Sequence, residues 1–196
     1  CLDDLKTKGM ISFLDATEMG SRVYRKFGFF ESTELVRMKG RAEPLREIKP
    51  AADTVIALSN EAAAEVISRD EQVLGGNRGS FFKRLINDRP ELSRCHLGTD
   101  GRVDGFVTGR VGRVATQIGP VIAEDFATAR ALISAAAKSV TDEVYIDVPT
   151  AAVELVDWLT DRGFTVERSF LRMGLDGAEL ATDWSHYYAI AGPDYA

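Results

Sequence analysis

The distribution of apolar and polar positions along the chain predicts both strands and helices. Short apolar runs bounded by glycine, proline or charged residues are typical of strands, whereas apolar positions three or four apart are typical of helices. The predicted helices are 18–27, 53–68, 81–88, 126–140 and 150–162. The predicted strands are 10–14, 29–38, 45–49, 93–99, 103–110, 114–122, 143–148, 165–173 and 185–191. Because the two kinds of element alternate, the pattern indicates an α/β protein.

Turn and capping residues set the expected boundaries between these elements. Asp100-Gly101 predicts a tight hairpin turn, and Ser80 and Thr150 are expected to cap the helices that follow them. Residues 39–44 carry a glycine and a proline among polar residues and are the best linker candidate. The chain is therefore expected to divide near this segment.

The chain contains an internal repeat. The first copy, residues 1–40, and the second copy, residues 145–173, each read as a strand ending in aspartate, a helix, a Gly-Phe pair and a further strand. In both copies an Arg-Met pair begins nine residues after the glycine. The matched positions are Asp15 and Asp147, Gly28 and Gly163, and Arg37 and Arg172. Since about 100 residues of strands and helices precede only the second copy, the chain is expected to start inside a domain.

Composition and charge narrow the class of protein. The 196 residues include 24 Lys and Arg against 30 Asp and Glu, a net charge of −6, and 45% of the residues are hydrophobic. This length accommodates one domain of about 150 residues plus a remnant. The acidity argues against nucleic acid and anionic membrane surfaces as partners. No apolar run approaches the roughly 20 residues that a membrane span needs.

Cysteine and histidine are too few for a disulfide framework or a built-in metal site. The chain has two cysteines, Cys1 and Cys95, and two histidines, His96 and His186, without the spacing of metal ligands. The low cysteine content predicts a reducing, cytoplasmic location. We expect no metal, and we interpret Cys95 and His96 as structural residues.

The repeat and the order of elements resemble the GCN5-related N-acetyltransferase (GNAT) superfamily, in particular its tandem-domain members. The segment LDATEMGSRVYRKFGF at 14–29 matches the motif around the penultimate helix of these proteins, and the elements of 45–191, with IGPVIAED at 118–125, follow the order of a whole GNAT fold. The resemblance implies a mixed, mostly antiparallel central sheet with helices on both faces. It assigns residues 1–40 to the end of a first GNAT domain and residues 41–196 to a second, complete one.

The resemblance implies an acetyl-CoA-dependent N-acetyltransferase that acts on a small-molecule amine. In such enzymes an amine attacks the thioester, and an acid protonates the departing thiolate. The acid is often a tyrosine four residues before the glycine of the Gly-Phe pair. That position is Tyr24 in the first copy and Leu159 in the second, so only the first copy offers a catalytic acid. The alternative role of Tyr24 is that of an amphipathic core residue.

The resemblance also implies a binding site for acetyl-CoA around Gly119 and Pro120. In GNAT proteins the fourth strand parts from the fifth, and its freed backbone groups bind the pantetheine arm. Proline has no N–H and suits such a point, as it would suit a bulge without a ligand. The expected cofactor-binding residues are Ile118, Gly119, Val121, Ile122 and Ala123.

The loop after this strand departs from the family pattern. GNAT enzymes usually carry Arg/Gln-x-x-Gly-x-Gly/Ala there and hold the pyrophosphate at a helix N-terminus. This chain has AEDFATA at 123–129, with Glu124 and Asp125 where the phosphates would lie. The carboxylates would repel phosphates and are expected to cap the helix instead. The second domain is therefore expected to bind acetyl-CoA weakly or not at all.

Two functions stay open from the sequence. One is the N-acetyltransferase, and the other is a non-catalytic GNAT-like module that binds a small molecule, a partner or its companion domain. Residues 10–38 would expose strand edges and an apolar helix face, which proteins rarely leave uncovered. Either upstream residues or the second chain of a homodimer is expected to cover them.

Overall fold

The computed structural model of the chain describes residues 2–46, 54–59 and 61–195. Its helices are α1 (Leu2–Thr7), α2 (Glu18–Tyr24), α3 (Ala63–Leu74), α4 (Gly79–Asp88), α5 (Phe126–Ala137) and α6 (Val153–Thr160). Its strands are β1 (Phe13–Ala16), β2 (Phe29–Arg41), β3 (Val55–Ala57), β4 (Arg94–Leu97), β5 (Val103–Val111), β6 (Thr116–Ile122), β7 (Glu143–Pro149), β8 (Thr165–Leu175) and β9 (Tyr187–Ala189). The predicted alternation of helices and strands is confirmed.

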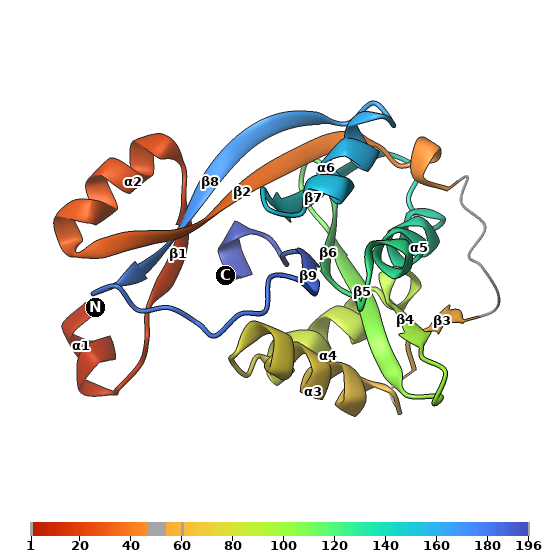
Figure 1. Cartoon of the computed structure of the whole chain (residues 1–196), viewed down its shortest axis with the longest axis horizontal. Coiled ribbons are helices and arrows are strands. Elements are labelled where there is room, and N and C mark those ends of the chain that lie inside the picture. The colour runs from red at the N-terminus through yellow and green to blue at the C-terminus, as the bar shows by residue number, and fades with distance from the viewer. Residues whose placement is uncertain (1, 47–53, 60, 196) are drawn as a thin grey trace.

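A single sheet contains all of these strands. The order is β1-β8-β2-β7-β6-β5-β4-β3, and β9 pairs with β6 (Figure 1). Within the described part, β6 and β7 pair in parallel and the other pairs are antiparallel. One core cluster includes Leu132 of α5 and Trp158 of α6, and another includes Phe82 of α4 and Val66 of α3. The expected mixed, mostly antiparallel sheet with helices on both faces is confirmed.

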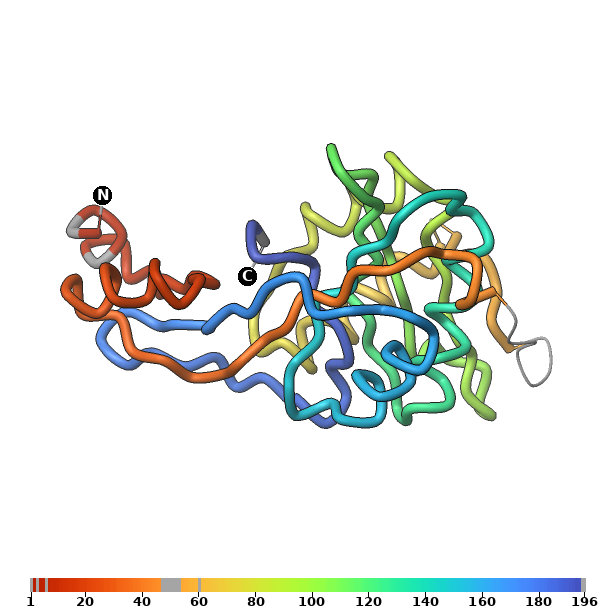
Figure 2. Tube along the Cα trace, turned by 90° about the horizontal axis from the view of Figure 1, so that it is seen from above, coloured from red at the N-terminus to blue at the C-terminus, as the bar shows by residue number. Residues whose placement is uncertain are grey.

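Two long strands connect the two lobes of the molecule. β2 and β8 lie side by side and are antiparallel. Both extend between the lobe of α1, β1 and α2, here called the open lobe, and the lobe that holds the other helices (Figures 1 and 2). β2 lies between β7 and β8, and β8 lies between β1 and β2. The final strand of each copy is therefore inserted beside the first strand of the other copy.

The two copies are related by an approximate twofold axis. It passes through the pair of Leu35 and Phe170, each of which is the seventh residue after the glycine of its Gly-Phe pair. The ladder between β2 and β8 skips Ser32 on one side and Glu167 on the other, each the fourth residue after that glycine. Even the irregularities of the ladder thus obey the symmetry. The repeat found in the sequence is a structural repeat.

The surroundings of the two copies differ. β7 has β2 and β6 as neighbours, whereas β1 has only β8 among the described strands. α6 buries Leu155, Trp158 and Leu159 in the core cluster that includes α5. The lobe of the first copy instead carries large apolar side chains that are each at least half exposed: Met10, Ile11, Met19, Val23, Phe27 and Phe30. The expectation of an uncovered apolar surface is confirmed.

Several predicted boundaries are wrong. Residues 55–57, predicted as the start of a helix, form β3, because Val55 and its neighbours pair with β4. Residues 39–41, predicted as linker, continue β2 and pair with β7. Leu45 lies in a short 3₁₀ helix rather than a strand, and residues 47–49 of that predicted strand lie outside the described residues. In each case pairing across the sheet, or its absence, overrides the local pattern.

The caps predicted at Ser80 and Thr150 are also wrong. Thr150 donates its hydroxyl to the carbonyl of Glu34, 3.3 Å away, and α6 begins after Ala152 without a side-chain cap. Ser80 lies inside the first turn of α4, and the Asn77 side chain accepts the N–H of the residue that begins this helix. The capping residue is decided by where the preceding loop enters the helix.

Candidate active site

β6 and β7 part after two pairs of residues. Thr116 pairs with Val144 and Gln117 with Tyr145, and no further pair joins these strands in the described part. Immediately beyond this point, the ladder between β6 and β5 also skips two residues, Gly119 and Pro120. The expected irregularity is therefore both a bulge toward β5 and a separation from β7. The proline fits here because it has no N–H to contribute to a ladder.

β9 lies in the gap between β6 and β7. On one side Val121 pairs with Ala189, and the backbone N–H of Ala123 donates to the carbonyl of His186 at 3.1 Å. On the other side the backbone N–H of Ile190 donates to the carbonyl of Asp147 in β7 at 2.9 Å. A segment near the C-terminus thus bridges the two strands that separate.

The residues expected to bind the pantetheine arm all lie in or next to this part of β6. The side chains of Ile118, Val121, Ile122 and Ala123 are buried. A Cβ atom placed on Gly119 would lie 2.2 Å from the carbonyl oxygen of Ile190. Because β9 lies against this stretch of β6, an extended ligand arm does not fit here while β9 is in place. The assignment of these residues to cofactor binding stays a prediction.

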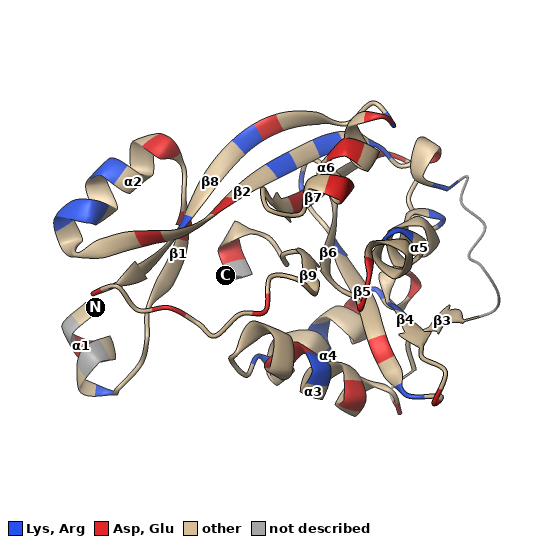
Figure 3. Ribbon diagram, in the orientation of Figure 1, with Lys and Arg blue, Asp and Glu red and all other residues tan. Residues whose placement is uncertain are grey.

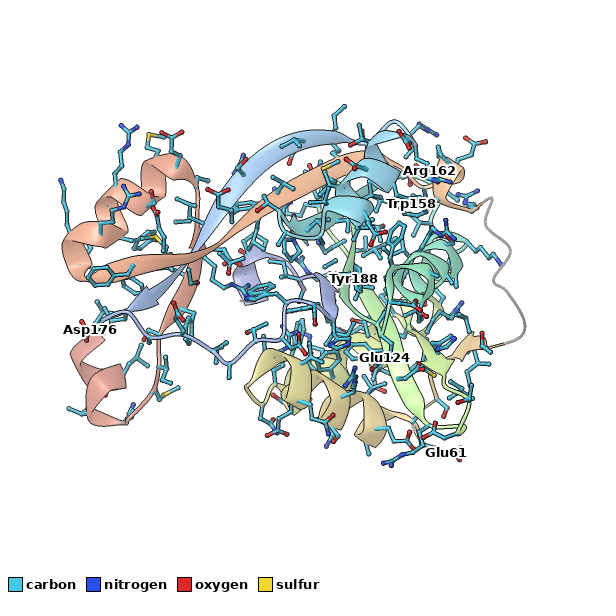
Figure 4. All side chains as sticks on the ribbon, in the orientation of Figure 1. Glu61, Glu124, Trp158, Arg162, Asp176 and Tyr188 are labelled. Carbon is cyan, nitrogen blue, oxygen red and sulfur yellow. The ribbon has the colours of Figure 1, made fainter. Side chains whose placement is uncertain are left out.

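The N-terminus of α5 also differs from a phosphate site. Asp125 accepts the N–H of Thr128 on its side chain at 2.7 Å, and this hydrogen bond lowers the pKa of Asp125. Glu124, labelled in Figure 4, forms an ion pair with Arg69 of α3 and lies 3.4 Å from Nε2 of His186. The expected capping by a carboxylate is confirmed for Asp125. The positive end of the helix is therefore already neutralised by the chain itself.

A hollow of about 480 Å³ adjoins Glu124, between α3 and the turn that joins β4 to β5. Its charged lining residues are Glu65, Asp100, Asp104 and Glu124, with Arg69 and Arg102. Four carboxylates against two guanidinium groups make this hollow unfavourable for a pyrophosphate.

Buried ion pairs join the two copies. Arg37 of β2 donates from Nε and Nη2 to the carboxylate of Asp147 in β7, at 2.8 and 2.9 Å. In the symmetric position, Arg172 of β8 donates to the carboxylate of Asp15 in β1, at 2.9 and 3.0 Å. Both aspartate side chains are fully buried, and burial raises the pKa of Asp147 even though Arg37 faces it. These aspartates therefore hold the copies together and are not free to bind an amine.

Sequence analysis marked all four of these residues as repeat positions but did not pair them. The structure pairs each aspartate with the arginine of the other copy, Asp147 with Arg37 and Asp15 with Arg172. The signal available was their equal spacing in the two copies. Exchange of partners between copies requires the intercalated strands, which no local pattern reveals.

Tyr24 is the last residue of α2 and lies on the open lobe. Its ring packs edge-on against Phe29 at 5.8 Å between centroids, and the side chain is 39% exposed. No hydrogen bond to its hydroxyl occurs within the described residues. The symmetric residue of α6, Leu159, is fully buried. The structure does not bring Tyr24 together with the residues around Gly119, which belong to the other lobe (Figure 1).

The weaker candidates have structural partners. His96 faces Asp104 across 2.5 Å, and burial raises the pKa of the Cys95 thiol, which disfavours a nucleophilic thiolate.

One cluster was not predicted from the sequence. In it, Arg78 donates to the carboxylate of Asp70 and to the hydroxyl of Tyr187. Its members come from α3, the loop before α4, and β9, so no single segment carried a signal. This cluster anchors β9 to the helices.

The sequence of this chain matches a known family over most of its length. A family model described as an acetyltransferase (GNAT) domain matches residues 66–189. The chain belongs to the GNAT acetyltransferase family. This GNAT chain has no match among curated proteins. In its described part no helix has the length and apolarity for crossing a bilayer, and no three His, Cys, Asp or Glu side chains are grouped as metal ligands would be.

Solved structures share the fold of this GNAT chain. A protein of Pyrococcus horikoshii assigned as an acetyltransferase is 21% identical, with a TM-score of 0.72, over 94% of this chain and 59% of that one. GCN5-related N-acetyltransferases of Sphaerobacter thermophilus and Kribbella flavida are 16% and 22% identical, with TM-scores of 0.56 and 0.55. Both matches cover 88% of this chain, and they cover 62% and 45% of the other chains. This GNAT chain therefore spans about half to three fifths of the length of these neighbours.

Proposed function

We propose that the protein is an acetyl-CoA-dependent N-acetyltransferase whose catalytic domain contains the first copy. The observation that carries this proposal is the difference between symmetric positions on α2 and α6. The first copy has a hydroxyl there, on Tyr24, and the second has the aliphatic side chain of Leu159. Family membership supports the reaction class, and the twofold relation supports the choice of copy.

In this proposal Tyr24 is the general acid. Bound acetyl-CoA would supply a thioester whose sulfur leaves as an amine takes the acetyl group. The Tyr24 hydroxyl gives its proton to that sulfur and regains one from water, which also takes up the proton released by the amine. The packing of the ring against Phe29 restricts its orientation, and the residue is 39% exposed.

The proposed acceptor is a small-molecule amine rather than nucleic acid or a membrane surface. The net charge is −6, and acidic and basic residues are interspersed along the ribbon of both lobes (Figure 3). Such a surface attracts neither phosphodiester backbones nor anionic lipids. An amine, by contrast, is not repelled by an acidic protein.

The proposed protein is a tandem GNAT, with the division between the domains near residue 40. β6 and α5 cover β7 and α6 in the second copy, and their images under the twofold relation would cover β1 and α2. We therefore propose that a strand and a helix of the same kind, supplied by upstream residues of the natural protein, cover the open lobe. The greater length of the neighbouring structures supports this assignment. A homodimer is the alternative way to cover the lobe.

The catalytic proposal is tested with Tyr24→Phe in the natural full-length protein. Release of CoA from acetyl-CoA is followed with a panel of amines that includes spermidine and free amino acids. We expect kcat to fall on the order of 10²-fold with KM little changed, because the proton donor alone is removed. Tyr145→Phe is the matched control, since its hydroxyl bonds Glu167 on the surface instead. Full activity of Tyr24→Phe would refute the role of this tyrosine, and the absence of turnover with any amine would favour a non-catalytic module.

The tandem proposal is tested by the reactivity of introduced thiols. Val23 of α2 and Val153 of α6 are 50% and 57% exposed, so Val23→Cys and Val153→Cys should react equally with a maleimide in the 196-residue chain. In the natural full-length protein we expect the thiol at position 23 to be protected and that at 153 to react fast. Equal reactivity there contradicts the proposed unit. Protection that appears only at high protein concentration indicates a homodimer instead.

A further inference from the structure

The segment of residues 186–191, here called the plug segment, fills the gap between β6 and β7. Its backbone pairs with both rims of the gap. On the β6 side Ile122 pairs with Tyr187 and Val121 with Ala189. On the β7 side Ile190 donates its N–H to the carbonyl of Asp147 at 2.9 Å. The plug segment therefore uses the backbone groups of both strands where a bound chain-like ligand would need them.

The plug segment is part of the core and not a loosely attached strap. Tyr187, Ala189, Ile190 and Ala191 are each at most 1% exposed. The ring of Trp184 stacks on Tyr187 at 5.6 Å between centroids, and Tyr187 receives a hydrogen bond from Arg78 at 2.7 Å. Removal of the segment would expose apolar surface and leave a buried guanidinium with one partner fewer.

The opposing strand is shaped to this segment. A Cβ atom on Gly119 would approach the carbonyl oxygen of Ile190 to 2.2 Å, so only glycine allows the two backbones to approach this closely. The backbone of Gly119 has a φ of 149°, which side-chain-bearing residues rarely adopt. Gly119 therefore suits a position where the backbone of the plug segment lies directly against β6.

The other end of the gap is closed to an anion. The Asp125 side chain already accepts the N–H of Thr128 at the start of α5. Glu124 pairs with Arg69 and approaches His186, the first residue of the plug segment. A pyrophosphate here would meet two carboxylates and would find the Thr128 amide, in the first turn of the helix, already in use. This observation is independent of the backbone pairing.

We infer that the plug segment permanently replaces the pantetheine arm in the second domain, so that this domain binds no acyl-CoA and the natural protein holds a single acyl-CoA site. The second domain then serves as a scaffold: its β8 completes the sheet of the first copy and carries Arg172 to Asp15. The inference rests on the proposed function only for the statement that the first domain binds acyl-CoA.

The test counts CoA molecules bound by the natural full-length protein in equilibrium dialysis. One CoA per protein is the expected result, and two per protein would overturn the inference. No binding at all would refute the proposed function while agreeing with the closed second domain. The failure of one proposal is thus distinguished from the failure of the other.

Hydrogen exchange of the same protein, with and without CoA, shows whether CoA displaces the plug segment. We expect the amide hydrogens of residues 118, 119, 121–123 and 186–191 to exchange at unchanged rates. Faster exchange at Tyr187–Ala189 together with slower exchange at 118–123 would show that CoA displaces the plug segment, which contradicts the inference.

A double variant separates the plug segment from the carboxylates. Glu124→Gln with Asp125→Asn removes both charges and leaves an amide oxygen that can still cap α5. Because the plug segment remains, we expect the count of bound CoA to stay at one. Glu61→Gln with Asp161→Asn, at two exposed positions away from the gap, also removes two negative charges and is the control for altered charge. A second bound CoA in the Glu124/Asp125 variant alone would mean that charge, and not the plug segment, kept the ligand out.

Discussion

The two copies share a ladder of strand pairs but differ in the residues that pack on it. At the repeated Gly-Phe pairs, Phe29 faces Leu175 across the ladder, whereas Phe164 lies against Gly40. On the helices, α2 presents Val23 to solvent at the position where α6 buries Trp158. The axis therefore relates backbones closely and side-chain surroundings only in part.

This difference indicates which features keep two repeated units together. The ladder between β2 and β8 and the two ion pairs join one copy to the other. A substitution there in one copy would therefore remove contacts of both copies. The helices differ in their surroundings, since α6 packs in a core cluster whereas α2 exposes Met19 and Val23. Tyr24 and Leu159 are such a divergent pair. In this protein the shared interface preserves the symmetry, and the outer faces carry what is specific to each copy.

The largest expected difference in stability is between substitutions in α6 and substitutions in α2. Trp158→Ala should lower the free energy of unfolding by about 3–5 kcal/mol, because it empties a buried site beside α5. Val23→Ala at the symmetric position should change it by less than about 0.5 kcal/mol in the 196-residue chain. Urea unfolding of both variants provides the measurement. A loss above about 1.5 kcal/mol for Val23→Ala would show that α2 is as well covered as α6.

The next largest effect on stability is expected at the two ion pairs that join the copies. Arg172→Met should cost about 3 kcal/mol, because it leaves the buried carboxylate of Asp15 unpaired. Arg37→Met should cost about 2 kcal/mol, since the Arg37 side chain is 16% exposed and water can reach the site more easily.

A double-mutant cycle with Asp15→Leu checks this prediction. The loss in Arg172→Met should be partly recovered when Asp15 is replaced as well, because no buried charge is then left over. Denaturant unfolding of the four proteins gives the coupling energy. Additive losses would mean that the exchanged pair contributes nothing specific to joining the copies.

A smaller effect is expected at the point where the ladder loses its symmetry. Gly40→Ala places a Cβ atom 2.4 Å from the ring of Phe164 and should cost about 1–3 kcal/mol, because the buried ring must shift. Arg41→Ala, an exposed position on the same strand, is the matched control. Thermal unfolding of both variants tests the prediction. Equal midpoints would show that the ring moves aside freely.

The smallest effect concerns the turn that leads into β9, a strand without a counterpart beside the first copy in the described part. Hydrogen bonds from Ser185 and His186 lower the pKa of Asp183 to about 2. The ionised form is favoured in the fold, so its contribution is complete above the ordinary pKa and is lost as pH falls toward 2.

Asp183→Asn should therefore cost well under 1 kcal/mol near neutral pH, because the carboxylate is half exposed. The difference from the unmodified protein should shrink between about pH 4 and pH 2. Urea unfolding across this range is the measurement. A difference that grows on acidification would contradict the sign of the shift.

Sequence analysis found the local features of both copies. Gly28, which ends the 3₁₀ helix that follows α2, and the spacing of the repeat depend on neighbours in the chain, and both predictions are confirmed. The helix proposed for 53–68 failed over residues 55–57, because pairing with β4 decides the conformation there. The cap expected at Thr150 failed for a related reason, since this residue bonds Glu34 in the other copy. Elements that depend on distant partners were the ones missed.

The order of elements, the repeated motif and the acidic start of α5 were determined by the sequence, because each rests on backbone preferences and contacts within a few residues. The exchange of strands between the copies, the pairs that Asp15 and Asp147 form, and the filling of the gap by the plug segment were decided only by the tertiary structure. These features join residues more than 40 positions apart. Their partners are selected by burial and by the pairing of strand edges, which no local pattern contains.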